Sequence, residues 1–89
     1  MMDESIFFKN GWERITDYEP RDGWYMFYVK KVRGIDFILQ VFRDECSLKQ
    51  VPPGSNVHEE GGRWYDLLTN ARCYKEEHLK AIETLFIYA

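Results

Sequence analysis

The chain has 89 residues, enough for one domain and too few for two independent cores. Its hydrophobic fraction of 45% and aromatic fraction of 17% predict a packed interior and exclude a disordered chain. Twelve Lys and Arg against 15 Asp and Glu give a net charge of -3, without the basic excess that draws proteins to phosphate backbones. No apolar run approaches the roughly 20 residues of a membrane span, and the acidic start lacks the basic region of a signal peptide. We therefore expect a cytoplasmic protein, with nucleic acid unlikely as a partner and no membrane contact.

The first elements of the chain are short. Residues 5–8 are apolar and predict an edge strand, which Asn10 and Gly11 separate from an extended piece at residues 12–15. Pro20 and then Asp22-Gly23 predict a turn, because proline fixes φ and glycine takes positive φ.

A hairpin follows. Residues 24–29 are aromatic and β-branched and predict the clearest strand of the chain, closed by two lysines. The turn at 32–34 leads into a second strand over residues 35–43, where a period of two places four apolar side chains on one face. These four are Ile35, Phe37, Leu39 and Val41.

The middle of the chain changes character. Residues 44–62 hold two prolines and three glycines and predict a long, mobile loop, which could include an extended piece at 48–51. Residues 63–67 predict another strand, and residues 75–82 a short helix rich in helix-forming residues. For residues 84–88 we favour a strand, although Leu79, Ile82, Leu85 and Phe86 also match a continuing helical stripe.

Together these elements predict a single domain over residues 1–89 of the α+β class, a small antiparallel sheet of four or five strands with one short helix. The expected core contains Tyr25 or its opposite-face neighbours Trp24 and Met26, together with Trp12, Phe27, Ile35, Phe37, Leu39, Val41, Trp64, Leu79 and Ile82.

One pattern extends over most of the chain. It runs through Trp12-x-x-Ile15, then Pro20-x-Asp22-Gly23-x-Tyr25-x-x-Tyr28-Val29, then Trp64-Tyr65 and a terminal apolar stretch. This pattern resembles a small family of phage and prophage proteins, domain-of-unknown-function family 551. The chain departs from the family in having residues 86–88 in place of a tryptophan-containing stretch, and in its longer middle loop. The resemblance implies a bacterial or viral origin and supplies no activity.

Two cysteines and two histidines are the candidates for metal or nucleophilic chemistry: Cys46, His58, Cys73 and His78. Their spacing contains no Cys-x2-Cys pair, which a zinc site commonly uses to fix two ligands on one turn. A cysteine nucleophile would need a hydrogen-bonded base and a third orienting group, and no motif surrounds either cysteine. We therefore expect buried or free thiols, although the spacing also allows a single disulfide, and no metal, no cofactor and no enzyme activity.

The aromatic strand at residues 24–29 is apolar on both faces, whereas a sheet covered on one side buries only one. The helix, the long loop, a second copy of the chain or a foreign protein could cover the other face. Trp, Tyr and Arg are the residue types that most often anchor protein interfaces. The expected partner-binding residues are Trp24, Tyr25, Tyr28, Lys30, Lys31 and Arg33.

The sequence thus predicts a non-catalytic protein-interaction module, an accessory protein encoded by a phage or prophage, whose partner is another protein or a second copy of itself. Two alternatives remain open. One is a small-ligand-binding module in which the aromatic residues and the long loop form a pocket. The other is a metal or enzyme site made by the cysteines and histidines.

Overall fold

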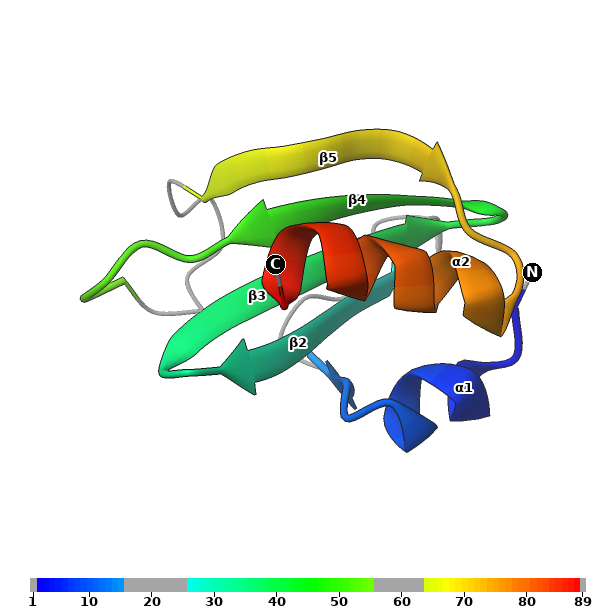
Figure 1. The fold of residues 1–89 in the computed structure, drawn as a ribbon, viewed down its shortest axis with the longest axis horizontal. Helices are drawn as coiled ribbons and strands as arrows, with labels where there is room; N and C mark the ends of the chain where they lie inside the picture. Colours follow the sequence, from blue (N-terminus) through cyan, green and yellow to red (C-terminus); the bar gives the residue numbers. More distant parts are fainter. Residues whose placement is uncertain (1, 16–25, 56–63, 89) are drawn as a thin grey trace.

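The fold is an antiparallel sheet with helices on one face, as the computed structural model in Figure 1 shows for residues 2–15, 26–55 and 64–88. Its five strands lie in chain order, each hydrogen-bonded to the next. They are β1 (Glu13–Arg14), β2 (Met26–Val32), β3 (Ile35–Phe42), β4 (Glu45–Gln50) and β5 (Tyr65–Arg72). The α+β class and the antiparallel sheet predicted from the sequence are confirmed. The predicted strands at 24–29, 35–43 and 63–67 correspond to β2, β3 and the start of β5, with Trp24 and Tyr25 outside the described residues.

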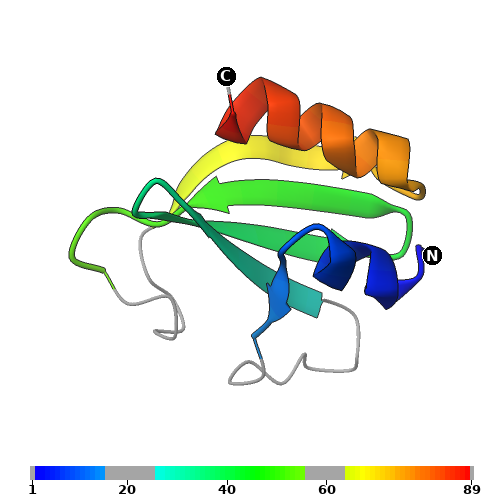
Figure 2. The same ribbon diagram turned by 60° about the horizontal axis from the view of Figure 1, so that its bottom comes forward.

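Three helical segments complete the fold: α1 (Glu4–Lys9), α2 (Glu76–Ile82) and η2 (Glu83–Ile87), a π-helical turn that continues α2 without a break. Figure 1 and Figure 2 show α1 and the α2–η2 helix on the same face of the sheet. The helix predicted at 75–82 is confirmed. None of the described helices is long and apolar enough to span a bilayer.

The hairpins between β2, β3 and β4 are tight. Arg33 and Gly34 connect β2 to β3 with φ angles of 53° and 78°, the left-handed backbone that two-residue hairpin turns require. Arg43 has a φ of 54° in the next turn. These short turns set the register of the paired strands. Tyr28 of β2 lies opposite Leu39 of β3, and Leu39 lies opposite Leu48 of β4.

The prediction of an edge strand at residues 5–8 is wrong, because these residues belong to α1. The Asp3 carboxylate accepts a hydrogen bond from the Ser5 amide at 3.0 Å and caps the first turn. Phe7 is buried and stacks on the Tyr28 ring with centroids 4.6 Å apart. The segment therefore contributes one apolar face of a helix instead of a strand.

The prediction of an irregular loop over residues 44–62 is wrong for its first part, which is strand β4. Cys46 and Leu48 are buried and alternate with more exposed neighbours, as a half-buried strand requires. The expected extended piece at 48–51 overlaps its second half. Residues 56–62 of the predicted loop lie outside the described residues.

The favoured strand at residues 84–88 is also wrong. The helix continues to Ile87, and the Tyr88 amide donates to the Glu83 carbonyl at 2.9 Å, five residues back in the chain. That spacing is the hydrogen bond of a π-helical turn. The helical alternative that the sequence left open is therefore the structure.

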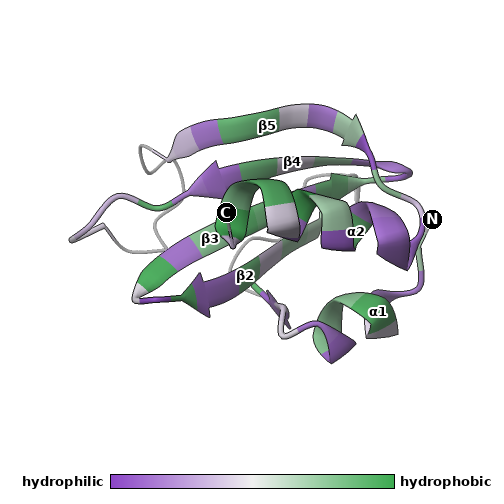
Figure 3. Ribbon diagram, viewed as in Figure 1, coloured by the Kyte–Doolittle hydropathy of each residue, from purple (hydrophilic) through white to green (hydrophobic). Residues whose placement is uncertain are grey.

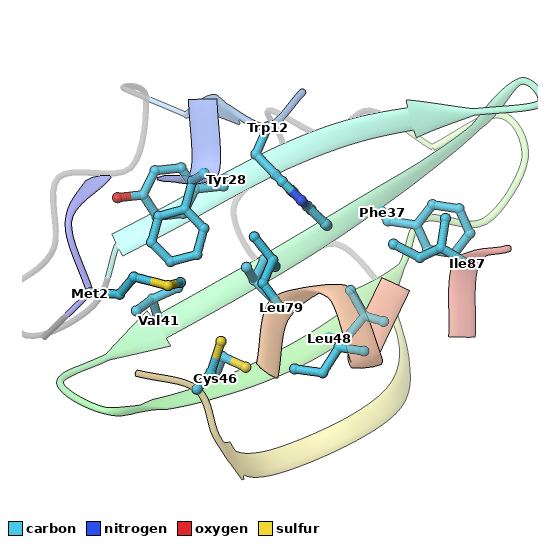
Figure 4. Close-up of a cluster of buried hydrophobic side chains, with 13 residues drawn as sticks. Met2, Trp12, Tyr28, Phe37, Val41, Cys46, Leu48, Leu79 and Ile87 are labelled. Atoms are coloured by element: carbon cyan, nitrogen blue, oxygen red, sulfur yellow. The ribbon is translucent and has the colours of Figure 1, made fainter. Parts of the chain in front are cut away.

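Apolar side chains fill both faces of the sheet. The main cluster lies between the sheet and the helices (Figure 4) and contains Met2, Phe7, Trp12, Tyr28, Phe37, Leu39, Val41, Cys46, Leu48, Cys73, Leu79, Ile82 and Ile87. On the opposite face, Ile15, Ile38 and Val51 are buried, with Phe27, Val29 and Trp64 packed against them. The expected core is confirmed for six residues that are buried: Trp12, Phe37, Leu39, Val41, Leu79 and Ile82. Met26, Phe27 and Trp64 are partly buried against the two clusters, and Ile35 is 37% exposed at the start of β3, so its placement in the core is wrong. Trp24 and Tyr25 lie outside the described residues.

We predict that Leu39→Ala lowers the free energy of unfolding by about 2 to 5 kcal/mol, because Leu39 is fully buried in the main cluster and its loss leaves a cavity. The matched variant Ile35→Ala, on the same strand and face, should cost less than half as much. Urea denaturation followed by circular dichroism measures both. Equal losses for the two variants would contradict the register of β3.

Candidate interaction surface

A buried ion pair connects the N-terminal segment, β2 and the C-terminal helix. The Glu83 side chain is 2% exposed, and its Oε2 accepts a hydrogen bond from Lys30 Nζ at 3.2 Å. Its Oε1 accepts from Trp12 Nε1 at 3.3 Å, and Lys30 Nζ also donates to the Asn10 carbonyl at 2.6 Å. Both oxygens of the buried carboxylate therefore have donors.

The Lys30 ammonium lies among aromatic rings. Its Nζ is 5.2 Å from the centroid of the Tyr88 ring and 5.9 Å from that of Trp12, within the range of cation–π attraction. Burial by itself would lower the pKa of Lys30, but the hydrogen bonds to Tyr88 and Glu83 outweigh it and raise the pKa. Lys30 is therefore charged at neutral pH.

A second polar bridge joins the two helices. Lys9 Nζ lies 3.1 Å from Glu76 Oε1, and Asn10 Nδ2 donates to Glu76 Oε2 at 2.9 Å. These hydrogen bonds lower the pKa of Glu76, Asn10 contributing most. The end of α1 is thereby held beside the start of α2.

The π-helical turn decides which C-terminal side chains face outward. Leu79, Ile82 and Glu83 face the sheet, and an uninterrupted α-helix would next bring residue 86 to that face. The wider turn places Ile87 there instead, beside Phe37 in Figure 4. Phe86 is left 36% exposed.

The result is an apolar surface at the end of the helix, which we call the C-terminal surface and define as Leu85, Phe86 and Tyr88. These side chains are 68%, 36% and 50% exposed. Figure 3 shows hydrophobic residues gathered at this end of the helix. An open groove of about 710 Å³ adjoins it, between Lys9 of α1 and the side of the helix that carries Ala81, Thr84 and Leu85.

The partner-binding residues predicted from the sequence separate into two groups. Tyr28 is 3% exposed and donates to Glu4 Oε1 at 2.9 Å, so it is an interior residue and its prediction as a surface residue is wrong. The Lys30 side chain is 14% exposed, with its ammonium held by Glu83. Lys31 and Arg33 are exposed, and Lys31 Nζ lies 4.0 Å from Asp36. Trp24 and Tyr25 lie outside the described residues.

Arg33 links the predicted surface to the C-terminal surface. Its Nη2 donates to the Ile87 carbonyl at 2.7 Å, which places a positive charge at the carbonyl end of the helix, where the helix dipole favours it. The hairpin tip thus adjoins the C-terminal surface. Sequence reasoning missed that surface because it favoured a strand at residues 84–88, although the stripe of residues 79, 82, 85 and 86 signalled a helix.

Cys46 and Cys73 come together in the core. They are 2% and 1% exposed and not bonded to each other as a disulfide, and the Cys73 amide donates to the Asp44 carbonyl at 2.7 Å. The hydrogen bond between the thiols and then burial raise the pKa of Cys46, which disfavours its thiolate. The expectation of two free thiols is confirmed.

The histidines do not join the thiols in the described structure. His78 Nδ1 accepts from the Tyr74 amide at 3.2 Å, and its ring lies edge-on to the Tyr74 ring. His58 lies outside the described residues. Within residues 2–15, 26–55 and 64–88, no three Cys, His, Asp or Glu side chains form a group that could hold a metal ion.

We predict that Lys30→Met lowers the free energy of unfolding by about 3 to 5 kcal/mol, because it leaves the buried Glu83 carboxylate without its cation. Lys31→Met, next in the chain but exposed, should change it by less than about 1 kcal/mol. The double variant Lys30→Met/Glu83→Met should recover most of the loss. Chemical denaturation of the three variants measures these changes in the free energy of unfolding. Equal losses for Lys30→Met and Lys31→Met would contradict a stabilising ion pair.

We also predict a loss of stability at alkaline pH. A raised pKa of Lys30 in the folded state means that its contribution is complete at neutral pH and is lost as the pH rises through that pKa, above the ordinary lysine value of about 10.4. The pKa of Tyr28 is raised as well, chiefly by burial, and acts in the same direction. Melting temperatures of Lys30→Met and Tyr28→Phe between neutral and strongly alkaline pH should therefore each fall less than that of the wild type. A wild-type melting temperature that is unchanged at alkaline pH would contradict this account.

Comparison with known proteins adds no relative to this description. No family model, curated protein or solved structure matches the chain. The resemblance to domain-of-unknown-function family 551 remains a prediction, and the function must be argued from the geometry above.

Proposed function

We propose that this chain is a small non-catalytic module that binds another protein through its C-terminal surface. The observation that carries the proposal is the outward position of Leu85, Phe86 and Tyr88 on one helical turn. Large apolar side chains in contiguous exposed positions commonly mark interaction sites. Tyr and Phe are also enriched in the cores of protein interfaces.

The rigidity of the turn supports this reading. The inner side of the turn is fixed by Glu83, with its bonds to Lys30 and Trp12, and by the packing of Ile87. A partner that binds preorganised side chains loses less conformational entropy on association than one that orders a mobile segment. Arg33 at the edge of the surface adds the residue type that most often accompanies aromatic anchors.

The chemistry of the described residues favours binding over catalysis. The buried carboxylate of Glu83 is paired with an ammonium, and the two thiols lie in the apolar core, so none of these groups faces an open site. A small-ligand-binding module would need aromatic rings that line an open pocket. The rings of Phe7 and Tyr28 instead stack on each other.

The biological setting is part of the proposal. The pattern from Trp12 to Val29 and at Trp64-Tyr65 resembles a family of phage and prophage proteins. A module of this size encoded by a phage or prophage would act as an accessory protein, in the cytoplasm of a bacterial host.

We predict that Leu85→Ser/Phe86→Ser, a variant of the C-terminal surface, loses its partner while remaining folded. Capture from a bacterial host lysate, quantified by mass spectrometry, should show at least about fivefold less of each specific partner than wild-type bait, as truncation of interface anchors does. The matched control is Tyr65→Ser, which removes a 58% exposed aromatic ring on β5 and should capture as the wild type does. Equal capture by all three baits would contradict the proposal, provided that their melting temperatures agree.

A further inference from the structure

The α2–η2 helix carries a protruding side chain and a recess side by side. Leu85 is 68% exposed, and the groove next to it has Ala81 and Thr84 on its helical wall. A surface that bears both shapes can bury both at once against a copy of itself, which is the property of a two-fold interface. A foreign partner would need to supply the two matching shapes separately.

The exposed residues of the helix form a stripe with the spacing that helix pairing requires. Positions 77, 81, 84 and 85, with spacings of four, seven and eight residues from the first, lie on one side of the helix and are all exposed. Alanine lies near the middle of the stripe, and small side chains at the contact allow two helices to approach closely. The stripe therefore offers a packing line along most of the helix.

Glu77 is exposed at the start of the helix, where Lys9 and Lys75 are exposed as well, and exposed cations lie at its other end. Glu76 and Glu77 begin α2, and the Glu77 side chain is 84% exposed. Arg33 lies at the other end, bound to the Ile87 carbonyl, and Lys31 is exposed on the same hairpin. Figure 1 shows the β2–β3 turn and the end of the helix on the side of the molecule away from the start of α2.

The relative direction of two such helices decides whether Glu77 can meet Arg33. An antiparallel pair brings Glu77 of each helix to Arg33 at the far end of the other, whereas a parallel pair brings Glu77 beside Glu77 and Arg33 beside Arg33. The only partner that Glu77 has within the chain is Lys75, at 3.7 Å, among the residues that the structure describes. Exposed pairs of this kind contribute little, so Glu77 remains available.

We propose that a second copy of this chain binds to the C-terminal surface, which names the partner in the proposed function and rests on it. The two α2–η2 helices run antiparallel about a two-fold axis. Leu85 of each copy enters the groove of the other, and Glu77 of each copy faces Arg33 of the other. Two Lys and two Glu line the groove, so copies that face each other here do not repel.

Sedimentation equilibrium of the full chain over a range from micromolar to millimolar tests the proposal. The wild type should change with concentration from a mass of 10.7 kDa to twice that mass. Leu85→Glu should weaken self-association at least about tenfold, because it replaces the apolar side chain that is buried on association with a charged one that must lose its water. The control Tyr65→Ser, on the sheet edge, should associate as the wild type does.

A charge exchange identifies the facing pair. Glu77→Arg alone should weaken the dimer, since it brings two cations together, and Arg33→Glu should do the same. The double variant Glu77→Arg/Arg33→Glu should restore association toward the wild-type value, which happens only if the two positions face each other across the axis. Circular dichroism of each variant shows whether the contact of Arg33 with Ile87 is needed for folding. If it is, Glu77→Arg alone still tests the facing pair, because Glu77 is not part of that contact.

A wild type that stays at 10.7 kDa at every concentration would overturn the second-copy proposal, as would a dimer that Leu85→Glu leaves intact. Failure of the double variant to recover would overturn the antiparallel arrangement. A monomeric wild type that still captures a different protein through Leu85 and Phe86 would leave the proposed function standing. A dimer that survives Leu85→Glu, together with unchanged capture by Leu85→Ser/Phe86→Ser, would contradict both.

Discussion

The contact between Lys30 and Glu83 is the constraint on which the arrangement of this small domain depends. It places a carboxylate that is 2% exposed against an ammonium from the sheet, and each group has further partners in the segment of Asn10 and Trp12. Removing one member of a buried ion pair costs more free energy than forming the pair contributes, because the remaining charge is left away from water without an opposite charge. One contact therefore fixes the positions of the N-terminal segment, of β2 and of the C-terminal helix relative to each other.

The helix end closes the core beside this contact. Glu83 faces Lys30 and Trp12, and a regular helical turn after it would present Phe86 to the sheet. The hydrogen bond from Tyr88 to Glu83 adds one residue to the turn, so Ile87 takes the inner position. Phe86 and Tyr88 are then held near the surface with Leu85. The proposed interface is thus a consequence of how the core is closed, which links the stability of the domain to the proposed binding.

Sequence patterns predicted the parts of the fold that local signals control. The alternation in β3, the hairpin turn at Arg33-Gly34 and the helix formers around Leu79 each predict one structure, and each is confirmed. Strand β4 was not predicted, because the prolines and glycines that follow it favoured a loop for the whole segment of residues 44–62. Residues 5–8 and 84–88 have β-propensity, and tertiary contacts of Phe7 and Ile87 outweigh it. The role of Lys30 was unpredictable, since a lysine at a strand end is ordinarily solvated and its partner is 53 residues away.

The central claim is that a π-helical turn over Glu83–Ile87 brings Ile87 into the core and leaves Phe86 turned outward. The most direct test is the scalar coupling across the hydrogen bond of the Tyr88 amide, measured by NMR on the isotope-labelled wild type. The account predicts that the Tyr88 nitrogen couples to the Glu83 carbonyl carbon, five residues earlier. Coupling to the Thr84 carbonyl carbon instead would show a regular α-helical turn, with Phe86 rotated toward the sheet, and would contradict the account.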